Sequence, residues 1–181
     1  MMKSRTEKGF TLVETLVAIS LLTIAIVAPM SLTTQSLTGA FYARDQVTAF
    51  YLAQEALEAV RSVRDGNILK TALGTPTPIL AGIAIDGSPF TVDTRTFPAT
   101  ISACSGVCPS LKTDGTFYGY DPDPSWKVTN FIRTVRAVPV AATGGADEVR
   151  VSVTVTWYTT PYNSRSFTLS DNLYAWVGSG T

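Results

Sequence analysis

The sequence predicts an α+β fold in which one long N-terminal helix packs on an antiparallel sheet of about four strands. Two observations predict it. Residues 10–64 carry helical signals with few interruptions, whereas after residue 66 glycine and proline become frequent and β-branched residues alternate with polar ones. The roughly 115 residues after this change are enough to bury a hydrophobic core.

Composition and charge narrow the classes of function. The 181 residues include 14 Lys+Arg, 14 Asp+Glu and no histidine, so the formal net charge is zero and nothing attracts the chain to nucleic acid. Without histidine the chain lacks the commonest general base and transition-metal ligand, and its two cysteines cannot form a four-thiolate zinc site. The sequence contains no nucleophile elbow or phosphate-binding loop. We therefore expect no enzymatic activity, no cofactor and no nucleic-acid partner.

Residues 10–30 form an apolar run long enough to cross a membrane as a helix, for which about 20 residues are needed. Glu14 is the only charged residue in this run, and basic residues outnumber acidic ones over residues 1–9. A carboxylate inside a membrane segment costs about 2.5–3.5 kcal/mol on insertion-based scales. The presence of Glu14 therefore needs an explanation.

Three ordinary interpretations of this run leave features unexplained. A secretory signal peptide has a shorter apolar core followed by a small-residue cleavage site, whereas this run continues past Pro29 as a good helix. A plain membrane anchor agrees with the length and the basic flank but gives no reason for Glu14. A helix buried in a soluble core agrees with the apolarity, but the rest of the chain is not helical enough to surround it.

The segment Gly9-Phe10-Thr11-Leu12-Val13-Glu14 follows a short basic leader and resembles the prepilin processing motif of type IV pilins and type II secretion pseudopilins. The match covers the leader and roughly the first third of the chain. It combines a glycine, an aromatic first mature residue, a glutamate shortly after it and a long apolar helix. The resemblance implies that prepilin peptidase removes the leader, residues 1–9, by cutting after Gly9 on the cytoplasmic face, and then methylates the new amine of Phe10.

The same resemblance explains Glu14. A carboxylate near hydrocarbon is tolerable where a cation pairs with it, and cleavage after Gly9 creates a cation at the amine of Phe10. In pilins, the glutamate pairs with the terminal amine of a neighbouring subunit during assembly. Glu14 would then form the assembly salt bridge, because docking of another subunit relieves the cost of the unpaired charge. The alternative is a carboxyl that is protonated or that reaches the membrane surface.

Pro29 lies near the end of the transmembrane and assembly segment, residues 10–30. It removes an i→i−4 hydrogen bond and predicts a helix kink. Pilins often carry a proline slightly further from the cleavage site, which leaves the position of the bend open.

Residues 31–66 predict an amphipathic continuation of the same helix. Its apolar stripe recurs at three- and four-residue intervals and consists of Ala49, Phe50, Ala53, Ala56, Leu57, Val60 and Val63. Gly66 follows as the expected left-handed C-cap.

Residues 67–181 predict a β-rich globular head outside the cytoplasm. Alternation of apolar and polar residues predicts strands over residues 89–97, 129–140, 148–158 and 165–169. Residues 143–146 contain two glycines and signal a hairpin turn. Residues 171–177 agree with either a continued strand or a helical turn.

Cys104 and Cys108 form the first candidate site of the head. Three residues separate them in a loop between Pro98 and Pro109. If the N-terminus stays cytoplasmic, the head lies where disulfides form, which predicts a structural disulfide worth about 2 kcal/mol in the chain-entropy model. The alternative is a redox-active pair, although that motif has two intervening residues.

Asp114, Asp121 and Asp123 form the second candidate site. Carboxylate oxygens are calcium ligands, so these residues are weak candidates for a metal site. The alternative is that they are turn formers, since Asp-Gly and Asp-Pro are common in turns. The aromatic residues beside them are expected to pack in the core rather than to form an exposed contact surface; they are Tyr118, Tyr120 and Trp126.

The resemblance implies a structural subunit of a type IV pilus or a related filament, and similarity of the helix to the minor-pilin branch favours a minor pilin. Its partners would be prepilin peptidase, other pilin subunits, the pilus assembly platform and, before assembly, the lipid bilayer. The subunit would wait in the bacterial cytoplasmic membrane and then enter a cell-surface filament. The alternatives are a major pilin, a type II secretion pseudopilin, and a membrane-anchored adhesin or binding module that never polymerises.

Overall fold

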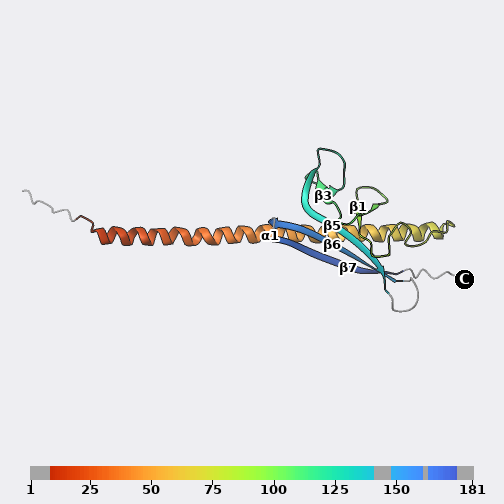
Figure 1. Ribbon diagram of the computed structural model, residues 1–181, viewed down its shortest axis with the longest axis horizontal. Helices are drawn as coiled ribbons and strands as arrows, with labels where there is room; N and C mark the ends of the chain where they lie inside the picture. Colours follow the sequence, from red (N-terminus) through yellow and green to blue (C-terminus); the bar gives the residue numbers. More distant parts are fainter. Residues whose placement is uncertain (1–8, 141–147, 161–162, 175–181) are drawn as a thin grey trace, which may run out of the picture. The chain divides into compact units, whose positions relative to one another are not determined.

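The computed structural model describes residues 9–140, 148–160 and 163–174. One helix is followed by seven strands (Figure 1). The chain divides into two compact units, Met1–Arg44 and Asp45–Thr181, and the strands all belong to the second. The α+β class predicted from the sequence is confirmed, including the long N-terminal helix and the antiparallel sheet.

Helix α1 spans Leu12–Ala72. The Thr11 hydroxyl oxygen accepts a hydrogen bond from the amide of Glu14 at 3.2 Å and so caps the N-terminus of the helix. Pro29 lies inside α1, which continues on both sides of it; the kink stays a prediction.

The predicted end of the helix at Gly66 is wrong, because α1 passes through this residue and continues to Ala72. The following residue gives the physical reason. The buried side-chain amide of Asn67 donates hydrogen bonds to the carbonyl oxygens of Ile79 at 3.1 Å and Ala81 at 3.0 Å. The extra helical turns are therefore fastened to the segment that follows them, a tertiary contact that a local capping signal does not contain.

Gly74 is the left-handed residue that ends the helix, with φ of 88°. Its amide donates to the carbonyl oxygen of Thr71 at 3.1 Å, and the amide of Thr75 donates to that of Lys70 at 2.9 Å. These two bonds form a Schellman motif, which satisfies carbonyls of the last turn.

The sheet has seven strands rather than about four. They are β1 (Phe90–Asp93), β2 (Thr100–Ala103), β3 (Ser110–Thr113), β4 (Tyr118–Gly119), β5 (Lys127–Pro139), β6 (Glu148–Thr160) and β7 (Asn163–Tyr174). The additional strands, β2 to β4, have only two to four residues, too few for an alternating pattern to be recognised. Within the predicted strand 89–97, only β1 is extended and paired.

Strand β5 is the centre of the sheet. One of its edges pairs with β6 from Phe131↔Trp157 to Pro139↔Val149, and the other pairs with β3 and β1. Strand β7 pairs with β6, and all of these pairs are antiparallel. The hairpin predicted at residues 143–146 lies outside the described residues. The ambiguous stretch that begins at residue 171 continues β7 through Tyr174.

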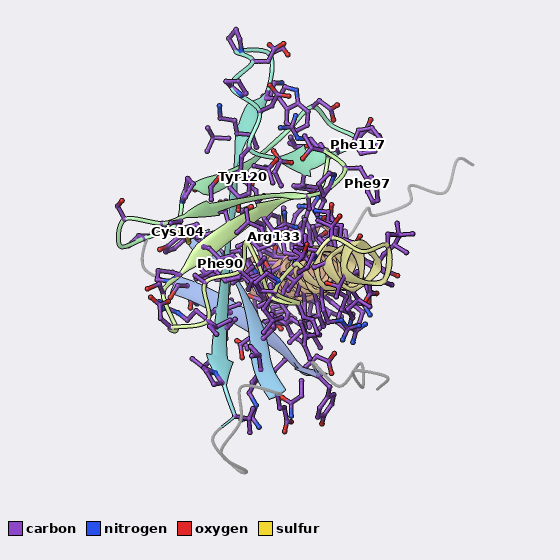
Figure 2. The ribbon with its side chains drawn as sticks, turned by 90° about the vertical axis from the view of Figure 1, so that its right-hand side faces the viewer. Phe90, Phe97, Cys104, Phe117, Tyr120 and Arg133 are labelled. Atoms are coloured by element: carbon purple, nitrogen blue, oxygen red, sulfur yellow. A yellow bond between two sulfur atoms is a disulfide. The ribbon has the colours of Figure 1, made fainter. Side chains whose placement is uncertain are left out.

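The core lies between the sheet and the part of α1 that begins at Ala49. Burial within the described part of α1 starts at this residue and covers most of the predicted apolar stripe, namely Ala49, Ala53, Ala56, Leu57 and Val60, together with Leu52. Strand β6 buries every second residue from Val149 to Trp157, as its alternation predicts. Strand β5 buries Phe131, Arg133, Val135 and Ala137, so a guanidinium enters an otherwise apolar layer (Figure 2).

Candidate functional site

The residues of the predicted processing site lie at the N-terminal end of the first unit. Gly9 and Phe10 immediately precede α1, and the Phe10 side chain is 79% exposed. Glu14 lies in the first turn of α1, where the helix dipole favours a negative charge. The predicted scissile position therefore lies a few residues before the carboxylate of Glu14.

The helix that follows is long and apolar enough to cross a membrane. The most apolar 18-residue stretch of this helix has a mean hydropathy of 2.2, and none of its residues is buried. The polar side chains in this region satisfy their hydroxyls within the helix: Ser20 donates to the carbonyl of Leu16 and Thr23 to that of Ser20, each at 2.8 Å. Such bonds remove the penalty of an unsatisfied donor in hydrocarbon.

Arg133 of β5 is a charged residue of the head whose role the sequence analysis did not predict. Its guanidinium is fully buried. Nη1 donates to the Leu52 carbonyl and the Glu55 carboxylate at 3.1 Å each, and Nη2 donates to the Val92 carbonyl at 2.6 Å. One side chain of β5 therefore links α1 and β1. The available signal was a basic residue on the same strand face as Phe131 and Val135.

A second charged cluster joins β1 to the loop that follows β4. The Arg95 guanidinium pairs with the Asp93 carboxylate at 2.7 Å and with Asp121, and it lies 4.7 Å over the ring of Trp126. Gly119 permits this arrangement, because a Cβ atom there would lie 2.3 Å from Arg95 Nε. The cluster is structural, and it occupies Asp121.

The three candidate calcium ligands are not brought together. Asp114 accepts hydrogen bonds from the amides of Thr116 and Phe117, and Asp123 accepts one from the amide of Ser125. Asp121 pairs with Arg95. Across the ranges that the structure describes, no group of three or more His, Cys, Asp or Glu side chains is placed to hold a metal ion.

The aromatic residues of this region have different environments. Tyr118 is partly buried and packs edge-to-face on Phe131 with ring centroids 6.2 Å apart. Tyr120 is partly buried and donates a hydrogen bond to the Arg133 carbonyl at 3.4 Å. Trp126 is partly buried and lies under Arg95.

Cys104 and Cys108 form a disulfide with a Cα–Cα distance of 5.1 Å. Cys108 is buried, and the bridge closes the loop between β2 and β3. A bridge across so short a loop stabilises the head by about 2 kcal/mol in the chain-entropy model.

The Asp93 carboxyl gives a pH dependence to the stability of the head. Partial burial raises the pKa of Asp93. Hydrogen bonds and charge from Arg95, together with a hydrogen bond from the amide of Tyr120, lower it by more than burial raises it. The pKa of Asp93 therefore lies below the ordinary value of 3.8. A carboxyl with a depressed pKa in the folded state stabilises the protein above its unfolded pKa. That stability is lost as the pH falls through the folded pKa.

We therefore expect the free energy of unfolding to fall as the pH is lowered from about 5 to about 2, and to fall less in Asp93→Asn. Urea denaturation at each pH measures both slopes. Asp65→Asn removes an exposed carboxylate on α1 that pairs with Arg64 and is the matched control for the loss of a surface charge. Equal slopes in the wild type and Asp93→Asn would contradict the assignment.

A family model matches the N-terminal part of the chain. Residues 4–28 match the model described as the prokaryotic N-terminal methylation motif, and this range includes Gly9, Phe10 and Glu14. Comparisons with curated proteins and with solved structures gave no significant match.

Proposed function

We propose that this chain is a structural subunit of a type IV pilus or a related filament. The premise is that it carries the prepilin-type N-terminal methylation motif and is consistent with a type IV pilin-like protein. The observation that carries the proposal is the motif followed directly by an exposed apolar helix that can cross a membrane. We prefer a minor pilin within this class, because of the helix sequence.

In this proposal the leader, residues 1–9, is removed by prepilin peptidase, which cuts after Gly9 and methylates the amine of Phe10. Residues 10–30 hold the subunit in the cytoplasmic membrane and later form the assembly helix. The amphipathic continuation begins at residue 31, and the helix itself extends to Ala72. The β-rich head that follows lies outside the cytoplasm.

Assembly follows from two driving forces. During assembly, each apolar helix leaves the lipid and packs against the apolar helices of other subunits. Close packing of these helices drives the association. The charge of Glu14 is costly in hydrocarbon until a cation pairs with it, and the amine of Phe10 from a neighbouring subunit is the cation that cleavage provides. The pilus assembly platform and other pilin subunits are therefore the partners, and the cell-surface filament is the final location.

The processing step is tested by the intact mass of the protein from membranes of cells with and without active prepilin peptidase. We expect the enzyme to remove residues 1–9 and to add one methyl group, and we expect Gly9→Leu to keep the leader. Gly39→Leu is the matched control, because neither glycine has atoms that a Cβ would meet within 4 Å, and it should be processed normally. Retention of residues 1–9 in the presence of the active enzyme would favour a membrane-anchored adhesin or binding module.

A further inference from the structure

Part of α1 beyond the membrane segment carries an exposed apolar stripe. A bilayer covers about 20 residues of a helix, which accounts for residues 10–30. Leu37 and Phe41 lie beyond it and are 55% and 49% exposed. With Arg44 they follow the i, i+4, i+7 spacing of one helix face, and the Arg44 guanidinium lies 5.4 Å over the Phe41 ring. The bilayer therefore does not account for the exposed side chains of Leu37 and Phe41.

The second unit contains a groove of complementary character. It has a volume of about 620 Å³ and lies between α1, where Tyr51, Glu55 and Glu58 line it, and Tyr118 of β4. A further hollow of about 480 Å³ shares Glu55 and Tyr118 and adds Thr94, Phe117 and Arg95, the last of which is already paired with Asp93 and Asp121. Tyr51 and Phe117 are both more than half exposed. The groove thus offers aromatic surface together with two carboxylates.

The charges of the groove and of the stripe are opposite. The larger hollow is lined by two acidic residues and by no basic residue among those the structure describes. Glu55 and Glu58 are paired with Arg133 and Arg61 respectively, but a carboxylate has two oxygens and accepts further donors. Arg44 is the single basic residue in the sequence between Lys8 and Arg61, so it is the one cation that this part of the helix can present.

We infer that the groove binds the Leu37, Phe41 and Arg44 face of α1 from a second copy of this chain. The inference rests on the proposed function and names the contact through which two subunits recognise each other outside the membrane. Helices inserted in the same direction pack in parallel. In a fibre in which one copy is displaced along the axis by 14 helical residues, about 21 Å, Arg44 of one copy lies at Glu58 of the other, Phe41 enters near Tyr118, and Leu37 lies at Tyr51.

A cross-link tests this register directly. In Leu37→Cys/Tyr51→Cys the two thiols of one chain are separated by 14 helical residues, about 21 Å, whereas a disulfide needs Cα atoms about 4.4–6.8 Å apart. Any bridge between them therefore joins two copies. The described native cysteines are already paired with each other and do not interfere.

We expect oxidation of sheared fibres to give a covalent dimer. The control Leu37→Cys/Tyr158→Cys places the second thiol at an exposed position of β6 outside the groove and should give at least about tenfold less dimer. An equal yield from the control overturns the inference, as does a bridge to a different protein with none between copies. Fibres that contain this chain but yield no dimer overturn the inference, whereas an absence of fibres counts against the proposed function.

The charge pairing is tested in the same background. Adding Arg44→Glu places a third carboxylate at the groove, and we expect it to lower the dimer yield at least about tenfold. Adding Glu58→Arg as well reverses both charges and should restore the yield. An undiminished yield with Arg44→Glu, or a loss that Glu58→Arg does not repair, overturns the assignment of Arg44 to this groove.

Discussion

Arg133→Met is expected to lower the free energy of unfolding by about 2–4 kcal/mol. The substitution removes the hydrogen bonds that Nη1 and Nη2 donate to the buried carbonyl groups of Leu52 and Val92, and a hydrogen bond from a charged group contributes about 1.5–3 kcal/mol. It also removes the cation from Glu55. Glu55 is partly exposed, so water compensates this part of the loss.

Urea denaturation of the full chain in detergent, followed by tryptophan fluorescence, measures this effect, because Trp157 is buried in the same core. Arg136→Met is the matched control on the same strand. Its guanidinium is exposed and donates to the Gly87 carbonyl at 2.8 Å, so we expect a change below about 1 kcal/mol. Similar losses in the two variants would show that Arg133 does not fasten the helix to the sheet.

Glu14→Gln is expected to reduce the yield of sheared fibres on the order of a hundredfold while the amount of protein in the membrane is maintained. The reason is that an unpaired carboxylate costs about 2.5–3.5 kcal/mol in the membrane. Pairing with the amine of Phe10 relieves this cost, and its relief is part of the driving force for assembly. A free energy of this size corresponds to roughly a hundredfold change in an equilibrium. The amide keeps the shape of the side chain but removes the charge.

Immunoblots of sheared fibres and of membranes measure the two pools. Thr15→Val is the control, because it removes a neighbouring polar group whose hydroxyl donates to the Leu12 carbonyl and leaves the charge in place. We expect its fibre yield to remain within about twofold of wild type, as for a surface change with a small energetic effect. A normal fibre yield from Glu14→Gln would contradict the assembly salt bridge.

The elements that sequence predicts well are those whose signal is repeated many times. Strand β6 alternates over its whole length, and its buried face follows that alternation from Val149 to Trp157. Helix α1 likewise presents an apolar run and then an apolar stripe. Short elements have no such repetition, which is why β2, β3 and β4 were not predicted.

Predictions from single residues failed where a tertiary contact determines the local structure. Gly66 has the character of a C-cap, but the hydrogen bonds of Asn67 to a later segment keep the helix going. Arg133 has the periodicity of a core position and the chemistry of a surface one. Its burial depends on carbonyl and carboxylate partners from α1 and β1, which no local pattern reveals.

The candidate sites divide in the same way. Gly9, Phe10 and Glu14 are contiguous in sequence, so their pattern needs no fold to be recognised, and the family match over residues 4–28 includes them. The groove beside α1 combines Tyr51 and Glu58 with Tyr118. Its existence depends on how β4 is placed against the helix, and the sequence alone gives no sign of it.

The central claim is that this chain is a processed filament subunit, and the intact mass with the N-terminal sequence of protein recovered from sheared fibres tests it most directly. The account predicts a chain that begins at N-methylated Phe10. A chain that still begins at Met1 in cells with active prepilin peptidase, or a processed chain that is absent from the fibres, would contradict it.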